Sequence, residues 1–264
     1  MSHYLHGHTE AVLAGHRRRT AEDCCAYLLP HLRGDETLLD VGCGPGTITV
    51  GLARRLPHGT VIAVDPAPEA VAETRQHVAA AGVVNVRVVR ADARTVGIDG
   101  PVDVAHAHQV LQHVSDPVAV LTAMAAHVRP GGVVAVRDAD YDAMSWYPRL
   151  PELDQWRALY RATAHALGAE PDAARVLPAW CRAAGLVDVK PSLGTWLHAT
   201  SEDRGRWAGM WAQRATGSSF ASHAVRLGLA DAADLARIAA GWRAWGDHPD
   251  GWLAIVHGQV LARV

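Results

Sequence analysis

The first half of the chain alternates between two hydrophobic patterns. Short apolar runs rich in Val, Leu and Ile are separated by longer stretches in which apolar residues recur every three to four positions. The runs predict strands at 37–41, 60–64, 84–89, 102–107 and 133–136, and the longer stretches predict helices at 46–56, 69–81 and 117–128. Strands that alternate with helices of about ten to fifteen residues are typical of a parallel sheet covered on both faces. We therefore expect an α/β protein with a doubly wound sheet.

Helical spacing also begins before the first strand. Apolar residues recur at this spacing from Ala21 to Leu32, Thr20 can cap the helix, and Gly34 can close it. The polar, His-rich residues 1–16 show no periodicity, and we interpret them as an arm. The expected unit 1–34 is thus an N-terminal arm and helix.

After residue 140, strands and helices no longer alternate regularly in the predicted pattern. Helices are expected at 153–167, at 173–184 and across the Trp-rich stretch 202–246, and strands at 186–197 and 252–264. Pro191 and Gly194 are expected to interrupt the first of these two strands. We expect 35–140 to form a ligand-binding core, 141–264 to complete the same fold, and about 200–250 to be a helical insertion between two late strands.

Composition narrows the class of protein. The 264 residues are 49% apolar and 20% charged, close to the globular average, which argues against disorder. The formal net charge of −2, without a basic stripe, argues against a nucleic-acid partner. No uncharged apolar run approaches the roughly 18 residues of a membrane span, and the N-terminus lacks a signal-peptide pattern. We therefore expect a cytoplasmic monomer or homodimer without a membrane partner.

Four cysteines are present, and none forms a C-x-x-C motif. Neither a disulfide framework nor a metal site is expected, and His3, His6 and His8 are interpreted as part of a solvated arm. Cys24 and Cys25 lie on an apolar helical stripe, so we expect burial, with thiol chemistry as the alternative. The many alanines and the single lysine fit the codon bias of a GC-rich bacterial genome.

The most informative motif is a glycine-rich loop after the first expected strand. Glycine occupies every second position at the end of the stretch Leu38-Leu39-Asp40-Val41-Gly42-Cys43-Gly44-Pro45-Gly46. Glycine lets the backbone turn sharply and approach a ligand closely, and open α/β sheets bind ligands at the carboxyl ends of their strands. Thr47 stands where a dinucleotide loop has its third glycine, and no Gly-Lys-Ser/Thr follows. The loop therefore fits neither the dinucleotide fingerprint nor a Walker A motif.

With Asp40 two residues before its first glycine, this loop resembles motif I of class I S-adenosylmethionine (SAM) dependent methyltransferases. Asp65 and Asp92, after the second and third expected strands, stand where that family binds the ribose hydroxyls and the adenine amino group. Residues 103–113 and 129–132 are similar to its fourth motif and to the turn before its fifth strand. The resemblance covers 37–137 and favours the ubiquinone/menaquinone-biosynthesis-like (methyltransferase type 11) branch. It implies a Rossmann-like sheet of seven strands, mostly parallel, with the last strand antiparallel.

The same resemblance implies a SAM site made from the loop and the strand ends. The expected cofactor contacts are Asp40, Gly42, Gly44, Gly46, Asp65, Pro66, Asp92, Ala93, His108, Gln109 and Arg19. For Asp92 and Arg19, a solvated surface charge is the alternative interpretation. On this reading, 35–140 is the SAM-binding core.

Methyl transfer from a sulfonium is an in-line displacement, so the protein mainly aligns the reactants and excludes water. A general base is needed only if the acceptor arrives protonated. His108 and His113, past the fourth expected strand, and Tyr141, past the fifth, are the catalytic candidates. A structural hydrogen bond is the alternative for each. We expect methylation at O, N or C of a small organic substrate.

The tryptophans of the expected insertion form a further candidate feature. Trp207 and Trp211 are four positions apart and therefore share one helical face, and Trp242 and Trp245 follow. We interpret them as an aromatic lid over an apolar or aromatic substrate, with an ordinary core as the alternative. Two other functions remain open: a SAM-binding protein that does not methylate, such as a cyclase or an interaction module, and, less favoured, an NAD(P)-dependent oxidoreductase.

Overall fold

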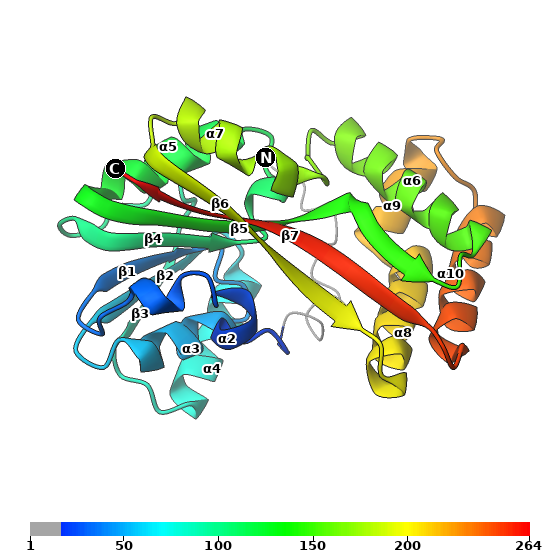
Figure 1. The fold of residues 1–264 in the computed structure, drawn as a ribbon, viewed down its shortest axis with the longest axis horizontal. Coiled ribbons are helices and arrows are strands. Elements are labelled where there is room, and N and C mark those ends of the chain that lie inside the picture. Colours follow the sequence, from blue (N-terminus) through cyan, green and yellow to red (C-terminus); the bar gives the residue numbers. More distant parts are fainter. Residues whose placement is uncertain (1–16) are drawn as a thin grey trace.

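The computed structural model describes residues 17–264, so the expected arm at 1–16 and its histidines lie outside the described residues (Figure 1). Seven strands form one sheet in the order β3-β2-β1-β4-β5-β7-β6. The strands are β1 (Thr37–Val41), β2 (Thr60–Asp65), β3 (Val86–Arg90), β4 (Val102–His108), β5 (Val128–Tyr147), β6 (Val187–His198) and β7 (Trp252–Arg263). Strands β1 to β5 pair in parallel, whereas β7 runs antiparallel to both β5 and β6. The predicted mostly parallel sheet with an antiparallel last strand is confirmed.

Helices cover both faces of the parallel half, as the apolar strands require. They are α2 (Ala21–Cys24), α3 (Thr47–Arg55), α4 (Pro68–Ala80), α5 (Pro117–His127) and α7 (Leu177–Ala183). Figure 1 shows α3 and α4 below the sheet, with α5 and α7 above it. Because successive strand residues point to opposite faces, Leu38 packs in the same cluster as Leu52 of α3, and Leu39 packs in that of Leu121 of α5.

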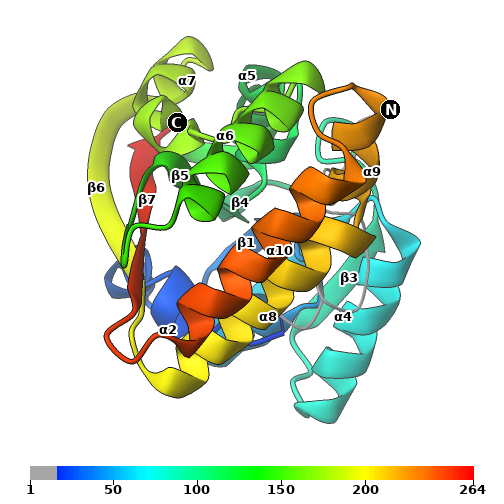
Figure 2. The same cartoon turned by 90° about the vertical axis from the view of Figure 1, so that its right-hand side faces the viewer.

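A second group of helices lies beyond the carboxyl ends of the parallel strands. It contains α6 (Pro151–Ala166), α8 (Ser201–Gly217), α9 (Ser219–Arg226) and α10 (Ala232–Asp247). Strands β5, β6 and β7 extend out of the parallel half to reach these helices, and Figure 2 shows α8 and α10 side by side. The expected helical stretch 202–246 is therefore three helices, inserted between β6 and β7 as predicted.

The first helix is shorter than the sequence predicts. Thr20 caps it, accepting a hydrogen bond from the Asp23 N–H, but α2 ends at Cys24 and the chain continues as turns. Pro30 lacks the N–H that a continued helix would donate to the carbonyl of Ala26. The expected burial of Cys24 and Cys25 is confirmed, because both pack under the sheet.

Two late strands differ from the prediction, β5 in its length and β6 in its continuity. β5 starts at Val128 and continues to Tyr147, with an irregularity between Asp140 and Ser145, because β7 pairs along most of its length. The expected interruption of β6 is wrong. Pro191 is tolerated because β6 is an edge strand, and Gly194 leaves the room that the Gln259 side chain occupies.

Candidate active site

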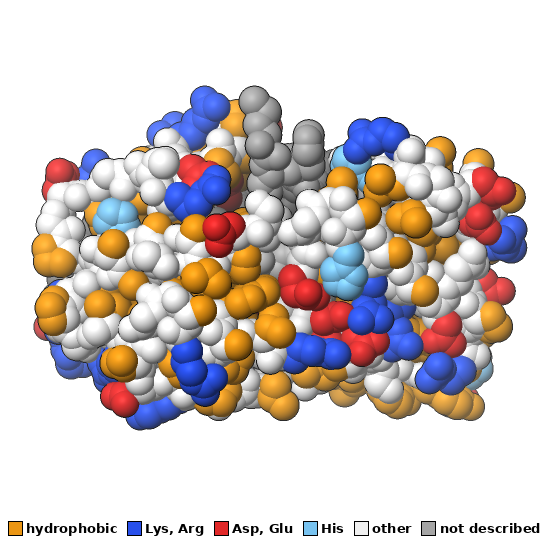
Figure 3. Space-filling model, turned by 90° about the horizontal axis from the view of Figure 1, so that it is seen from above, with side chains coloured by type: hydrophobic (Ala, Val, Ile, Leu, Met, Phe, Trp, Pro, Cys, Tyr) orange, Lys and Arg blue, Asp and Glu red, His pale blue; other side chains and the backbone are white. Residues whose placement is uncertain are grey.

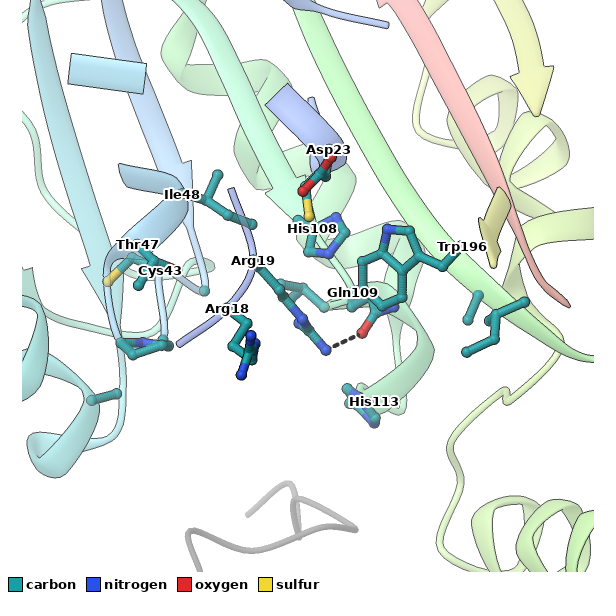
Figure 4. A pocket seen from close by; sticks show the side chains of 18 of the residues that line it. Arg18, Arg19, Asp23, Cys43, Thr47, Ile48, His108, Gln109, His113 and Trp196 are labelled. Carbon is teal, nitrogen blue, oxygen red and sulfur yellow. Dashed lines mark hydrogen bonds between the residues drawn. The ribbon is translucent and has the colours of Figure 1, made fainter. Parts of the chain in front are cut away.

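A cavity of about 1270 Å³ separates the parallel half from the helical group. The glycine loop and the ends of β2 and β4 line one wall, and α8 with part of β6 lines the other. Figure 4 shows Cys43 and Thr47 on the first side and Trp196 on the second, with Arg19 between them. Pockets that hold one drug-sized ligand measure about 300–1,000 Å³, so this cavity has room for a cofactor and a second molecule together.

The glycine loop contributes open backbone to the cavity. Gly42 and Gly44 both line it and have positive φ values of 70° and 55°, a conformation that glycine adopts without strain. No atom lies within 4 Å of the position that a Cβ on Gly44 would occupy, so a ligand can lie against this backbone. A Cβ on Gly42 would clash with Val110. Gly46, expected to touch the cofactor, instead packs against Thr74 of α4 and is not among the lining residues.

Asp65 ends β2 beside the loop. Its carboxylate accepts hydrogen bonds from Gly44 N–H at 3.1 Å and from Ala67 N–H at 2.9 Å. Each carboxylate oxygen has a second lone pair, so the same group can also accept from ligand hydroxyls. Pro66 lines the cavity next to it. The two backbone bonds fix the orientation of this carboxylate.

Asp40 lies at the cavity wall, but its oxygens are engaged inside the protein. Thr49 Oγ1 donates to it at 2.7 Å, and His106 Nδ1 lies 2.9 Å from its other oxygen. His106 Nε2 in turn lies 3.3 Å from Cys25 Sγ. Although burial opposes its charge, Cys25 and the Asp40 hydrogen bond raise the pKa of His106 to about 10. Asp40 thus holds the end of β1 in place, and its expected direct contact with a cofactor is not what this geometry favours.

Asp92 and Ala93 line the cavity after β3. Arg94 donates two hydrogen bonds to the Asp92 carboxylate, from Nε at 3.0 Å and from Nη2 at 2.8 Å. The hydrogen bond from Arg94 lowers the pKa of Asp92 below its ordinary value. The carboxylate is therefore ionised and available only through its remaining lone pairs.

His108, the last residue of β4, is buried at the cavity wall. Neither ring nitrogen has a hydrogen-bond partner among residues 17–264. Burial lowers the pKa of His108 well below its usual value, and Arg19, Arg137 and His257 add to the effect. The imidazole is therefore neutral, with one nitrogen able to accept a proton and one able to donate.

Gln109 connects three elements at the same place. Its Oε1 accepts from Arg19 Nη2 at 2.6 Å, drawn in Figure 4, and its Nε2 donates to His257 Nε2 at 2.8 Å. His257 Nδ1 then donates to the Ile255 carbonyl. Gln109 has an unusual positive φ of 54°, which aims its side chain into this chain of bonds. Arg19 is thereby held at the cavity wall, and its guanidinium carbon lies 5.4 Å from the centroid of the Trp196 ring.

His113 also lines the cavity, and Gln112 binds its Nε2. Gln112 Oε1 accepts from the Ala139 N–H, so Gln112 Nε2 donates to His113 Nε2 at 3.0 Å. The ring proton therefore lies on Nδ1. Burial, followed by Arg19 and Arg214, lowers the pKa of His113 to about 3. His113 is thus a hydrogen-bond donor rather than a base.

Tyr141 lines the cavity from β5 and stacks on Tyr160 of α6, with ring centroids 4.1 Å apart. Burial raises the pKa of Tyr141, so its hydroxyl stays protonated.

The tryptophans of the inserted helices lie in two places. Trp207 and Trp211 of α8 line the cavity. Trp242 and Trp245 are wholly buried among the helices, so the expected lid role is wrong for these two. An α10 face that packs on α6 and α8 has no surface left for a ligand.

Several lining residues were missed in the sequence, among them Trp196, Met144 and Arg214. Trp196 and Met144 lie on late strands, and nothing local marks them as site residues. Arg214 follows Trp211 by three positions on α8, so the shared helical face was a usable signal.

The outer surface adds two observations. Charges of both signs are interspersed on the face shown in Figure 3, without a continuous basic stripe. Among the described residues, no helix is both long enough and apolar enough to cross a bilayer.

Comparisons with known proteins agree with this geometry. A family profile described as "Methyltransferase domain" matches residues 38–132. An uncharacterized methyltransferase of Schizosaccharomyces pombe is 30% identical over 272 residues, covering 98% of this chain and 95% of its own. A trans-aconitate 2-methyltransferase of Azoarcus is 35% identical over 133 residues, half of each chain.

Solved structures share the fold. Coclaurine N-methyltransferase, bound to N-methylheliamine and S-adenosylhomocysteine, superposes with a TM-score of 0.54 at 17% identity, covering 94% of this chain and 74% of its own. The expected Rossmann-like methyltransferase fold and SAM cofactor are thereby confirmed, and an oxidoreductase or a non-methylating role is not favoured. The chain belongs to the class I SAM-dependent methyltransferases, in the branch of the type 11 and related methyltransferase domains.

Proposed function

We propose that this enzyme transfers the SAM methyl group to O, N or C of a small organic molecule held between the glycine loop and α8. The observation that carries this proposal is the single continuous cavity of about 1270 Å³. It joins the loop, where the cofactor would lie, to an aromatic wall formed by Trp196, Trp207 and Trp211. A net charge of −2 supports a small molecule over a nucleic acid as acceptor. The name of the Azoarcus relative, which refers to trans-aconitate, supports a small acceptor too.

The cofactor is assigned to the loop side. The open backbone of Gly42 and Gly44 would contact it, and Asp65 would accept from the ribose hydroxyls, with Pro66 beside it. Asp92 and Ala93 would border the adenine. When bound, SAM supplies a methyl group on a sulfonium, which is already a good leaving group. Asp40 and Gly46 act indirectly, since they shape the loop from behind.

Arg19, Gln109 and His108 are assigned to the junction between cofactor and acceptor. Gln109 holds Arg19 in place, and a guanidinium so fixed suits the cofactor's carboxylate. His108 is the favoured base, because it is neutral and its nitrogens have no partner among the described residues. His113 and Tyr141 would orient the acceptor by hydrogen bonds. We also propose a cytoplasmic enzyme that acts as a monomer or homodimer.

The test is calorimetric titration of the protein with SAM, S-adenosylhomocysteine and NADH. We expect micromolar binding of the two sulfur compounds and none of NADH. Asp65→Ala should weaken the binding of both sulfur compounds by roughly a hundredfold or more, since each of two hydrogen bonds to a charged group contributes about 1.5–3 kcal/mol. Asp99→Ala is the matched control, because Asp99 is exposed and lies outside the cavity. Binding of NADH alone, or equal loss in both variants, would contradict the assignment.

A further inference from the structure

The two edges of the sheet are protected to different degrees. β3, at one edge, has only five residues, and its Arg87 and Arg90 are exposed charges. β6, at the other edge, has twelve residues, and Figure 2 shows it at the margin of the molecule, outside β7. An edge strand presents unpaired backbone N–H and C=O groups, and proteins protect such strands by short length, charges, proline or bulges. Only part of β6 has these protective features.

The protective features of β6 lie in its first half. Its register with β7 shifts between Val187 and Lys190, and Pro191 follows. From residue 192 to residue 198 the register is regular, and the sequence contains no acidic residue, lysine, arginine or proline. Among residues 17–264, no strand pairs with the outer side of this stretch. Residues 192–198 are therefore open to pairing with a strand of another chain.

Two large apolar side chains favour such pairing. Leu193 is 75% exposed and Leu197 is 61% exposed, and both lie on the outer face with Thr195. Trp196, of the opposite parity, packs inwards with the cores of both halves. No other large apolar side chain in a strand of the described chain is as exposed as these two leucines. Contact with a second apolar surface would remove them from water.

A second copy of β6 complements this stretch. Twofold symmetric dimers use the same surface on both subunits, and two identical strands related by a twofold axis run antiparallel. With the axis at Thr195, Leu193 lies opposite the partner's Leu197, and the two copies of Thr195 face each other, a pair that stabilises antiparallel ladders. Because residues 192–198 contain no acid, lysine or arginine, no like charges of these types oppose each other. A charged partner would find no countercharge there.

The size of this interface sets its strength. A ladder of seven residues makes a strip about 23 Å long and about 10 Å wide. That area is well below the roughly 800 Å² per subunit of a standard interface, so a weak and reversible dimer is expected.

We propose that residues 192–198 of β6 form the interface of a reversible homodimer, in which the β6 strands of two copies pair antiparallel across a twofold axis at Thr195. The two seven-stranded sheets then form one continuous sheet. The axis lies beside the cavity wall, because Trp196 and His198 of the same strand line the cavity. This inference goes beyond the proposed function, since it holds whichever molecule the cavity binds.

The first test follows the wild-type, full-length protein by sedimentation velocity from about 1 µM to about 100 µM, the range of a weak interface. We expect the average mass to rise from that of one chain towards that of two. Hydrogen exchange should slow in peptides covering 192–198 at the higher concentration, and peptides covering β3 should not change. A mass that stays at one chain, or a dimer without slower exchange in 192–198, would overturn the proposal.

Paired substitutions test the register. Leu193→Glu/Leu197→Glu places like charges opposite each other across the axis, so dimerisation should weaken by at least about tenfold. Leu193→Glu/Leu197→Lys places opposite charges there, so dimerisation should recover at low salt and weaken as salt is added. Val84→Glu is the matched control, because Val84 is 97% exposed and lies outside β6, and it should dimerise like the wild type. Equal loss in both double variants, or a similar loss in Val84→Glu, would overturn the proposed pairing.

Discussion

The two walls of the cavity are built on different principles. The parallel half packs aliphatic side chains between strands and helices, with Leu39, Ile62 and Val134 typical of its core. It presents mainly backbone and carboxylates to the ligand. The helical half packs aromatic rings on one another, with Trp156 lying 4.6 Å from Trp211 and 4.8 Å from Trp242 between ring centroids. It presents ring faces and a buried arginine.

This difference separates the two tasks of the enzyme. A glycine loop at a strand end depends little on which side chains surround it, so the same arrangement can hold one cofactor in many proteins. Aromatic walls depend on the shape of every neighbouring ring. We infer that the parallel half is general to the chemistry and the helical half is specific to the acceptor.

The largest effect is expected from removing the central ring of the helical half. Trp156→Ala should lower the free energy of unfolding by about 3–5 kcal/mol, because a wholly buried indole that contacts Trp211 and Trp242 is replaced by a cavity. Urea unfolding measures this. Trp252→Ala, at a partly exposed tryptophan of β7, should cost less than about 1 kcal/mol. Similar losses of unfolding free energy in both variants would contradict the interpretation that the aromatic core stabilises the helical half.

The next effect concerns the junction of the two halves. His108→Asn should lower kcat by about a hundredfold or more if His108 removes the acceptor's proton. Because its pKa is held well below 6.5, wild-type activity should persist as the pH falls below neutrality. Transfer of labelled methyl to an acceptor found by screening, followed across pH, measures both. A kcat that changes less than about tenfold would leave His108 a positioning residue and point to an acceptor that needs no base.

A smaller effect is expected in the loop of the parallel half. Gly42→Ala would place a methyl group against Val110 at a positive φ, at a cost of about 1–3 kcal/mol. We expect SAM to bind roughly ten- to a hundredfold more weakly, because the loop must shift. Gly82→Ala is the control, since Gly82 also has a positive φ but no atom within 4 Å of the added carbon and no place in the cavity. Unchanged SAM affinity in Gly42→Ala would contradict the prediction, because the loop would then accommodate the methyl group without weakening the binding of SAM.

The smallest effect concerns Asp138, in β5 where the halves meet. Burial raises the pKa of Asp138 to about 8, so the folded protein keeps it protonated at neutral pH while the unfolded chain ionises it above about 4. The folded state then binds more protons, and this group makes stability fall as pH rises from about 4 to about 8. Asp138→Asn should remove that fall, gaining about 1 kcal/mol or more relative to wild type between about pH 5.5 and pH 7.5. Urea unfolding at both pH values tests it, and parallel curves for the two proteins would contradict the prediction.

The fold of the parallel half could be predicted from the sequence because its signals are local. Apolar runs, helical spacing and the position of Asp65 after its strand are all fixed within a few residues, so strands β1 to β4 and the acidic strand ends fell where predicted. Gly46 shows where prediction from local sequence fails. Its spacing suits a cofactor loop, but whether it faces the ligand or Thr74 depends on how α4 packs.

For the helical half, the sequence predicted the helices and the excess of tryptophan but not the role of each tryptophan. Its helices and its excess of tryptophan were visible, yet the same helical face signal describes a lid and a core equally well. Only the packing of α10 on α6 and α8 assigns Trp242 to the core, while Trp211 remains at the cavity.

The sequence by itself determined the α/β architecture, the glycine loop and the acids beside it, because hydrophobic period and backbone freedom are properties of neighbouring residues. The tertiary structure alone decided which groups meet across the cavity. Arg19, His108, Trp196 and Arg214 lie far apart in the chain, and their charges, burial and proton positions follow from the three-dimensional surroundings rather than from residue type.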